Sequence, residues 1–170
     1  MTTSYVYLCS KAAGRDAIDW DKIAGVELVE TNTGDKARLK TVAKAVWTDE
    51  ALFFRFECED DHVVATHTKR DDPVYNEDCV EIFIDEEGQG RHYIELEFSP
   101  KNVIFDARIE NDGRQYKVNA EWNAEDMESE VLQQADGSLI YHIVLPLRHF
   151  KTKPQPGTEW RINFYRIDES

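Results

Sequence analysis

The chain has 170 residues, and its 20 basic and 34 acidic side chains give it a net charge of −14. A chain of this length can bury one substantial core, so we expect a single domain covering residues 1–170. The negative charge disfavours nucleic acid and anionic membranes as partners, and no apolar run approaches the length of a membrane span. Three cysteines without an evident pairing favour a reducing compartment, but a secreted chain given a new start Met would look the same, so localisation stays open.

The first half of the chain consists of short segments in which apolar and polar residues alternate, the pattern of a β-strand with one buried face. Residues 5–9 predict a first strand, and residues 16–23 predict a loop with one helical turn. Residues 41–47 and 52–60 flank a four-residue linker and predict a β-hairpin. Residues 62–67 predict a further short strand.

The most regular strand is expected from residue 78 to residue 85, directly after a charged loop that contains Pro73. Val80, Ile82 and Ile84 fall on one face of this strand, and Glu81 falls on the other. Tyr75 stands six residues before Glu81, in the preceding loop. The alternation therefore predicts that an aromatic ring and a carboxylate reach the same rim.

The second half continues in the same way, with strands expected at residues 92–98, 103–109, 116–122, 128–134, 139–145 and 160–167. In residues 103–109 the alternation places Phe105 inward and Arg108 outward. Nine to eleven short strands with almost no helical periodicity are typical of an all-β protein. We expect an antiparallel β-sandwich of the jelly-roll or immunoglobulin-like kind.

The sequence shows no strong catalytic or cofactor motif: phosphate loops, zinc-ligand spacing and nucleophile elbows are all missing. Tyr75 and Glu81 instead suit carbohydrate, because a flat ring stacks on a sugar and a carboxylate accepts its hydroxyl hydrogen bonds. Two plainer interpretations stay open, namely that Tyr75 packs on the sandwich edge and that Glu81 pairs with a base such as Arg108. Glu81 with Glu95 or Glu97 would also supply the two carboxylates of a glycoside hydrolase.

At these residues the sequence resembles the family 9 carbohydrate-binding modules. The resemblance runs through AKAVWTDEALFFRFECED (residues 43–60), DPVYNEDCVEIFID (72–85) and GTEWRINFYRID (157–168). It implies that Tyr75 takes the place of a tryptophan that forms one wall of an aromatic clamp, and that Glu81 binds sugar hydroxyls. Glu97 stands where family members can place an arginine. The clamp's second tryptophan belongs to a segment beyond residue 168, so Trp20 or Tyr165 would have to substitute.

The resemblance also implies structural calcium, for which residues 60–61, 71–72 and 85–87 offer acidic loops, although no ligand loop of defined spacing is present. We therefore expect a non-catalytic carbohydrate-binding module without a cofactor other than possible calcium. Its site would comprise Tyr75, Glu81, Arg166 and Arg108, although strict alternation puts Arg166 on the buried side of its strand. The alternatives are an accessory module that binds a protein partner, and a hydrolase.

Overall fold

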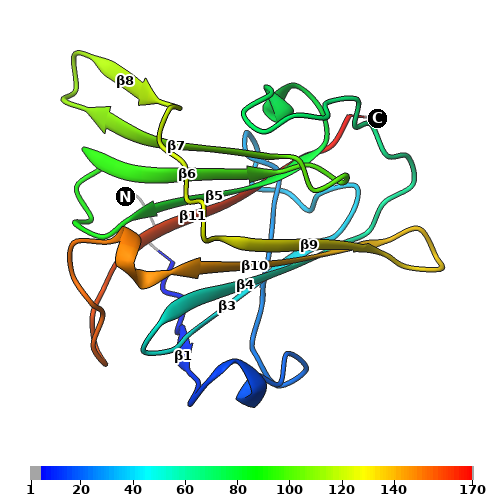
Figure 1. Ribbon diagram of the computed structural model, residues 1–170. Coiled ribbons are helices and arrows are strands. Elements are labelled where there is room, and N and C mark those ends of the chain that lie inside the picture. Colours follow the sequence, from blue (N-terminus) through cyan, green and yellow to red (C-terminus); the bar gives the residue numbers. More distant parts are fainter. Residues whose placement is uncertain (1–4, 170) are drawn as a thin grey trace.

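The computed structural model describes residues 5–169 and contains eleven strands in two sheets (Figure 1). The first sheet comprises β1 (Ser10–Lys11), β2 (Val26–Glu27), β3 (Thr41–Trp47), β4 (Ala51–Cys58), β9 (Glu128–Gln133) and β10 (Leu139–Pro146). The second sheet comprises β5 (Cys79–Asp85), β6 (His92–Phe98), β7 (Ile104–Asn111), β8 (Tyr116–Asn119) and β11 (Arg161–Ile167). Three short 3-10 helices complete the secondary structure: η1 (Arg15–Ala17), η2 (Val74–Asn76) and η3 (Leu147–His149). None of the helices within the described range is long and apolar enough to cross a membrane.

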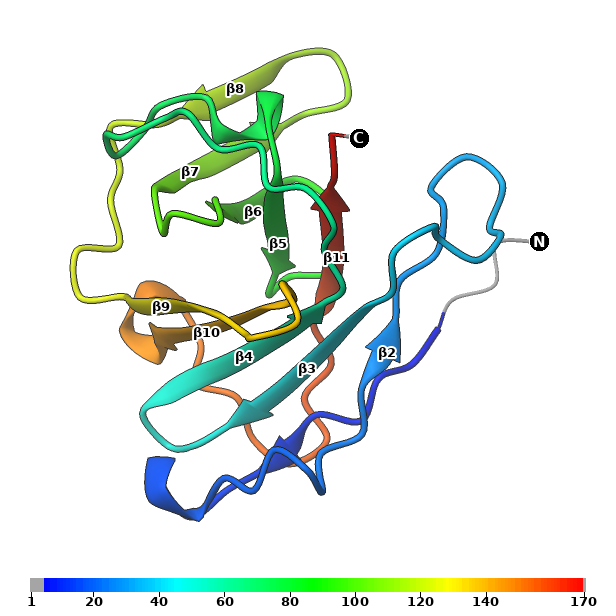
Figure 2. The same ribbon diagram turned by 90° about the vertical axis from the view of Figure 1, so that its right-hand side faces the viewer.

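The strand order is β1-β3-β4-β10-β9 in the first sheet, with β2 also paired to β3, and β11-β5-β6-β7-β8 in the second. All pairings are antiparallel except that of β1 with β3. The two sheets lie face to face (Figure 2). The expected all-β sandwich and its hairpin of residues 41–60 are confirmed.

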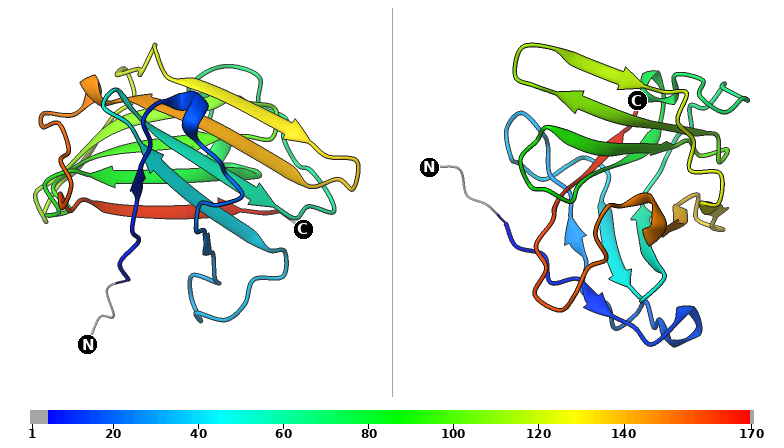
Figure 3. Two further views of the ribbon diagram at one scale, coloured as in Figure 1. Left: turned by 90° about the horizontal axis from the view of Figure 1, so that it is seen from below. Right: turned by 60° about the vertical axis from the view of Figure 1, so that its left-hand side comes forward.

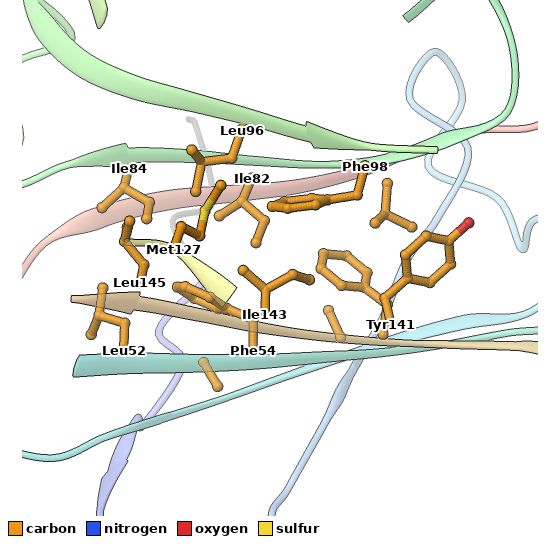
Figure 4. Close-up of a cluster of buried hydrophobic side chains, with 14 of the residues drawn as sticks. Leu52, Phe54, Ile82, Ile84, Leu96, Phe98, Met127, Tyr141, Ile143 and Leu145 are labelled. Atoms are coloured by element: carbon orange, nitrogen blue, oxygen red, sulfur yellow. The ribbon is translucent and has the colours of Figure 1, made fainter. Parts of the chain in front are cut away.

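The main core lies between the sheets, where the alternation predicted it. Ile82 and Ile84 of β5 and Leu96 of β6 face Phe54 of β4 and Ile143 of β10, and all five are at most 2% exposed (Figure 4). Burying an aliphatic or aromatic side chain of this size stabilises the fold by roughly 1.5–3 kcal/mol. This row of apolar residues fixes the facing of β5, so that Glu81 leaves the opposite side of the sheet.

The N-terminal segment covers the outer face of the first sheet (Figure 3). Ile18, Trp20 and Ile23 pack there against Val46 and Phe53. Two expectations for this half of the chain were wrong. Residues 5–9 form no strand, since pairing with β3 begins only at residue 10, and residues 62–67 run as an irregular connection.

A further apolar cluster covers the outer face of the second sheet, the side turned away from the first. Val74 of η2 is fully buried there against Phe105, Ala107 and Ile109 of β7. The expected facing of β7 was therefore wrong, because Phe105 points to this outer cluster and Arg108 points towards the first sheet. The alternation of residues 103–109 correctly separated the two faces of β7. Because both faces of this sheet are covered, the apolar side chains of β7 did not show which face points towards the first sheet.

Candidate functional site

On the outer face of the second sheet, one side chain from each of four strands lies in a single row. Pairing across β11, β5, β6 and β7 aligns Tyr165, Glu81, Glu97 and Phe105. Residues on this row lie one strand apart, about 4.8 Å, so Tyr165 and Phe105 stand about 14 Å from each other with both glutamates between them. The row is an acidic centre flanked by aromatic rings.

Tyr75 lies over one end of this row. Its ring contacts the ring of Phe105 edge-on, with 5.5 Å between the centroids, and 43% of the residue stays exposed. Two anchors hold the η2 turn that carries it: Val74 is fully buried beneath the turn, and the Asp72 carboxylate accepts hydrogen bonds from the backbone amides of Thr68 and Lys69. Tyr75 and Glu81 therefore share one face of the molecule, as the sequence indicated.

Glu81 differs from the solvated carboxylate that the alternation suggested, because it is only 8% exposed. Glu97 faces it directly across β5 and β6, and Glu95 lies two residues along β6 on the same side. Burial raises the pKa of all three carboxyls, and Glu95 adds to the effect at Glu81. The pKa of Glu97 rises to about 9, because the charges of Glu81 and Glu95 act in addition to burial.

Two more rings, those of Phe83 and Tyr93, line this face beside the glutamates. Phe83 of β5 contacts Tyr165 edge-on at 5.5 Å and lies 6.2 Å from Tyr93. Of the two substitutes considered for the second wall of the clamp, only Tyr165 lies on this face. Trp20 packs beside His142 on the far side of the first sheet, with 6.0 Å between the rings, so it cannot contact a ligand bound near Tyr75.

Arg166 lies on the other side of the second sheet from Glu81. It pairs with Val80 in register and shares its inward facing, so its guanidinium reaches the first sheet. There it contacts Asp60 at 2.8 Å and Asp168 at 2.9 Å, with the Arg166 side chain only 9% exposed. The structure therefore separates Arg166 from Tyr75 and Glu81, and strict alternation, not a bulge, decides its place.

Arg108 also points away from Glu81. It lies over the ring of Trp122, 4.6 Å from the centroid, and donates a hydrogen bond of 2.6 Å to the backbone carbonyl of His149. A groove of about 280 Å³ opens beside it at the end of the sheets. Its rim charges are already paired, since Glu87 contacts both Lys151 and His92.

The acidic loops considered for calcium use their carboxylates within the protein. Asp85 accepts hydrogen bonds from the amides of Glu87, Gly88 and Gly90, at 2.6 to 3.0 Å. Asp61 pairs with Arg38, as Asp60 does with Arg166. A calcium ion would have to displace these partners.

The structure is a β-sandwich, and one face of its second sheet carries aromatic and acidic side chains side by side. Residues 13–169 match the family described as "Carbohydrate family 9 binding domain-like". The chain belongs to this family and is a carbohydrate-binding module of the family 9 type.

Among its relatives is an extracellular protein of Arthroderma benhamiae, 24% identical over 139 residues that cover 75% of this chain. The match covers 63% of that relative, so the chain spans less than two thirds of its length.

Three solved structures share the fold. A family 9 carbohydrate-binding module from Caldicellulosiruptor kristjanssonii, in complex with glucose, has a TM-score of 0.66 at 16% identity. The match covers 95% of this chain and 78% of the module's chain. Its complex with cellotriose also gives 0.66 at 16% identity, with coverages of 94% and 76%. A protein from Bacteroides uniformis, described as carbohydrate-binding, gives 0.76 at 13% identity, with coverages of 94% and 82%.

Proposed function

We propose that the outer face of the second sheet is the sugar-binding surface. Tyr75 would supply the stacking platform, Glu81 the hydroxyl acceptor, and Tyr165 the second aromatic contact. The observation that carries the proposal is the single row in which Glu81 lies between Tyr165 and the Tyr75–Phe105 ring pair. A sugar needs an apolar ring face and polar acceptors close together, and this row supplies both.

The proposed ligand is a mono- or oligosaccharide, and the complexes of the related modules with glucose and cellotriose support this class. Arg166 and Arg108 are left out of the proposed site, since both point towards the first sheet. The extent of the face supports more than one sugar ring, because Tyr165 and Phe105 stand about 14 Å apart at strand level.

We also propose that the surface binds its sugar without cleaving it. A glycosidase needs one carboxyl that stays protonated and one that ionises, which requires environments that push the two pKa values apart. The raised pKa of Glu97 would suit an acid, but burial also raises the pKa of Glu81, so the environment of Glu81 does not favour an ionised second carboxyl. Glu97 is also only 1% exposed, which leaves it no direct access to a scissile bond.

Calorimetric titration of glucose and cellotriose into wild type, Tyr75→Ala and Tyr165→Ala tests the proposal. Each substitution is expected to weaken binding about tenfold, which corresponds to roughly 1.4 kcal/mol of lost ring contact. Tyr5→Ala is the matched control, because Tyr5 is 91% exposed and lies outside this face. An unchanged affinity in both test variants would contradict the site. Absence of heat with every sugar tested would favour the alternative of a protein-binding accessory module.

A further inference from the structure

The outer face of the second sheet also holds a thiol and two carboxyls in a buried cluster. Cys79 and Glu81 are two residues apart on β5 and share one face, and Glu97 is the cross-strand partner of Glu81. Cys79 and Glu97 are each 1% exposed, and Glu81 is 8% exposed. These three side chains form what we call the Cys79 cluster.

The Cys79 cluster has no positive partner. Within residues 5–169, no lysine, arginine or histidine forms an ion pair with Glu81 or Glu97. One carboxylate oxygen of Glu97, Oε2, is buried without any hydrogen-bond partner. Burial favours the protonated form of Glu97, but buried polar oxygens normally have a partner in either form, so this oxygen marks a position that a ligand can fill.

A second acidic cluster provides the comparison. Asp60, Asp78 and Asp168 also converge within 4.8 Å of one another, but the guanidinium of Arg166 contacts two of them. The fold has therefore placed a cation within one cluster of three carboxyls. The donor atoms of the Cys79 cluster also lie within 4.8 Å of one another, and no arginine of the described residues forms an ion pair with its two carboxyls.

The donor atoms suit a tetrahedral metal ion. One donor atom from each of Cys79, Glu81 and Glu97 lies within 4.8 Å of the other two, and the Cys79 sulfur is 3.7 Å from Oε1 of Glu81. Zinc–sulfur bonds of about 2.3 Å and zinc–oxygen bonds of about 2.1 Å at the tetrahedral angle put these atoms about 3.6 Å apart. The distance between the Cys79 sulfur and Glu81 Oε1 therefore already fits such an ion.

We propose that the Cys79 cluster is a Zn²⁺ site with Cys79, Glu81 and Glu97 as its protein ligands. Calcium and magnesium take oxygen ligands, whereas zinc accepts thiolate and carboxylate in the same site. Binding displaces the proton of the Cys79 thiol, and that of Glu97 where it is protonated, so protons leave as the ion enters. The fourth position is open to water or to Glu95. The zinc site shares Glu81 with the proposed sugar surface. Its test rests on Cys79 and Glu97, which are each 1% exposed and have no part in the sugar proposal, so the two proposals can fail separately.

The test uses the full chain carrying Cys9→Ser, which removes the one exposed thiol of the described residues. The protein is stripped with a chelator under reducing conditions and then titrated with Co²⁺ and Zn²⁺. We expect one equivalent to bind, with a thiolate-to-cobalt charge-transfer band. Adding Cys79→Ser should abolish the band and weaken Zn²⁺ binding more than about 100-fold, beyond the effect typical of outer-shell changes. Adding Glu97→Gln should weaken binding at least about tenfold while the band remains.

The matched control is Cys58→Ser in the same background, because Cys58 is buried but lies in the main core. It should retain the band and the affinity. If the Cys79→Ser variant fails to fold, the Cys9→Ser protein still tests the proposal, because absence of the charge-transfer band in that protein would overturn it. Loss of the band in the Cys58→Ser variant would also overturn the proposal. A Zn²⁺ affinity that Cys79→Ser leaves unchanged would do the same.

Discussion

Replacing Arg166 by Met removes the cation that holds β11 to the first sheet. Its guanidinium bonds Asp60 at 2.8 Å, Asp168 at 2.9 Å, the Glu59 carbonyl at 2.5 Å and the Thr41 hydroxyl at 3.2 Å. The side chains of Arg166 and Asp60 are only 9% and 2% exposed. Met keeps most of the volume of the arginine stem but removes the cation from buried Asp60, whose remaining donor is the backbone amide of His62, whereas Asp168 keeps its ion pair with Arg38.

The expected cost follows from this burial. Removing one partner of a buried ion pair costs about 3–5 kcal/mol, because the remaining charge stays desolvated. That loss is about a third of the stability of an ordinary domain, and it corresponds to a fall in Tm of roughly 6–20 °C at this size. Asp60→Asn, added to Arg166→Met, should restore part of the loss by removing the unpaired charge.

The loss should also depend on pH. Burial raises the pKa of Asp60, and Arg166 opposes this effect. Without the arginine, the folded state favours protonated Asp60, which carries no unpaired charge. The stabilisation of the variant by this proton is present at low pH and is lost as the pH rises through the folded pKa of Asp60. The difference in unfolding free energy between variant and wild type should therefore be smaller at about pH 4 than at pH 7.

Urea denaturation followed by circular dichroism measures these differences, with Arg161→Met as the control. Arg161 lies on the same strand but is exposed, so its replacement should change stability by less than about 0.5 kcal/mol. Sugar affinity should be unchanged by Arg166→Met, since its guanidinium lies on the far side of the sheet. A loss of stability below about 1 kcal/mol, or a loss of sugar affinity in the folded variant, would refute the placement of Arg166.

Three further outcomes follow from the same structure. Asp85→Ala should cost about 1–3 kcal/mol in thermal or urea denaturation, because three backbone amides lose their acceptor; an effect near zero would contradict this role. In metal-free protein the unfolding free energy should fall as the pH rises from about 5 towards 9, since the raised pKa of Glu97 makes the protonated form the stable one; Glu97→Gln should flatten this profile. Added Ca²⁺ should raise Tm by less than about 1 °C, because the acidic loops already have protein partners; a larger rise would show a calcium site.

Much of the fold could be predicted from local patterns. Alternation in residues 78–85 placed Ile82 in the core and Glu81 on the opposite face, and the hairpin of residues 41–60 followed from the same period. The alternation also put Cys79 on the side of Glu81 and Arg166 on the buried side of its strand. These outcomes depend only on the pleat, which turns successive side chains to opposite faces.

The facing of β7 could not be predicted in this way. Phe105 and Arg108 lie on opposite sides of a sheet that is covered on both faces, and the outer cover comes from Val74, thirty-one positions earlier in the chain. A periodic pattern gives two faces but does not say which neighbour covers each. For this reason Arg108 lies outside the face on which the sequence had placed it beside Glu81, and the alternative in which it pairs with Glu81 is wrong.

The sequence by itself determined most of the strands and which side chains share a face of each strand, because these follow from local periodicity, and it indicated that Tyr75 and Glu81 lie on one side. Only the tertiary structure decided that Tyr165 is the ring beside Glu81, and that Glu97 faces it without a cation. Both depend on the order and register of β11, β5 and β6, which pair segments up to about eighty residues apart. Long-range register is set by the packing of the whole sandwich, and no local pattern records it.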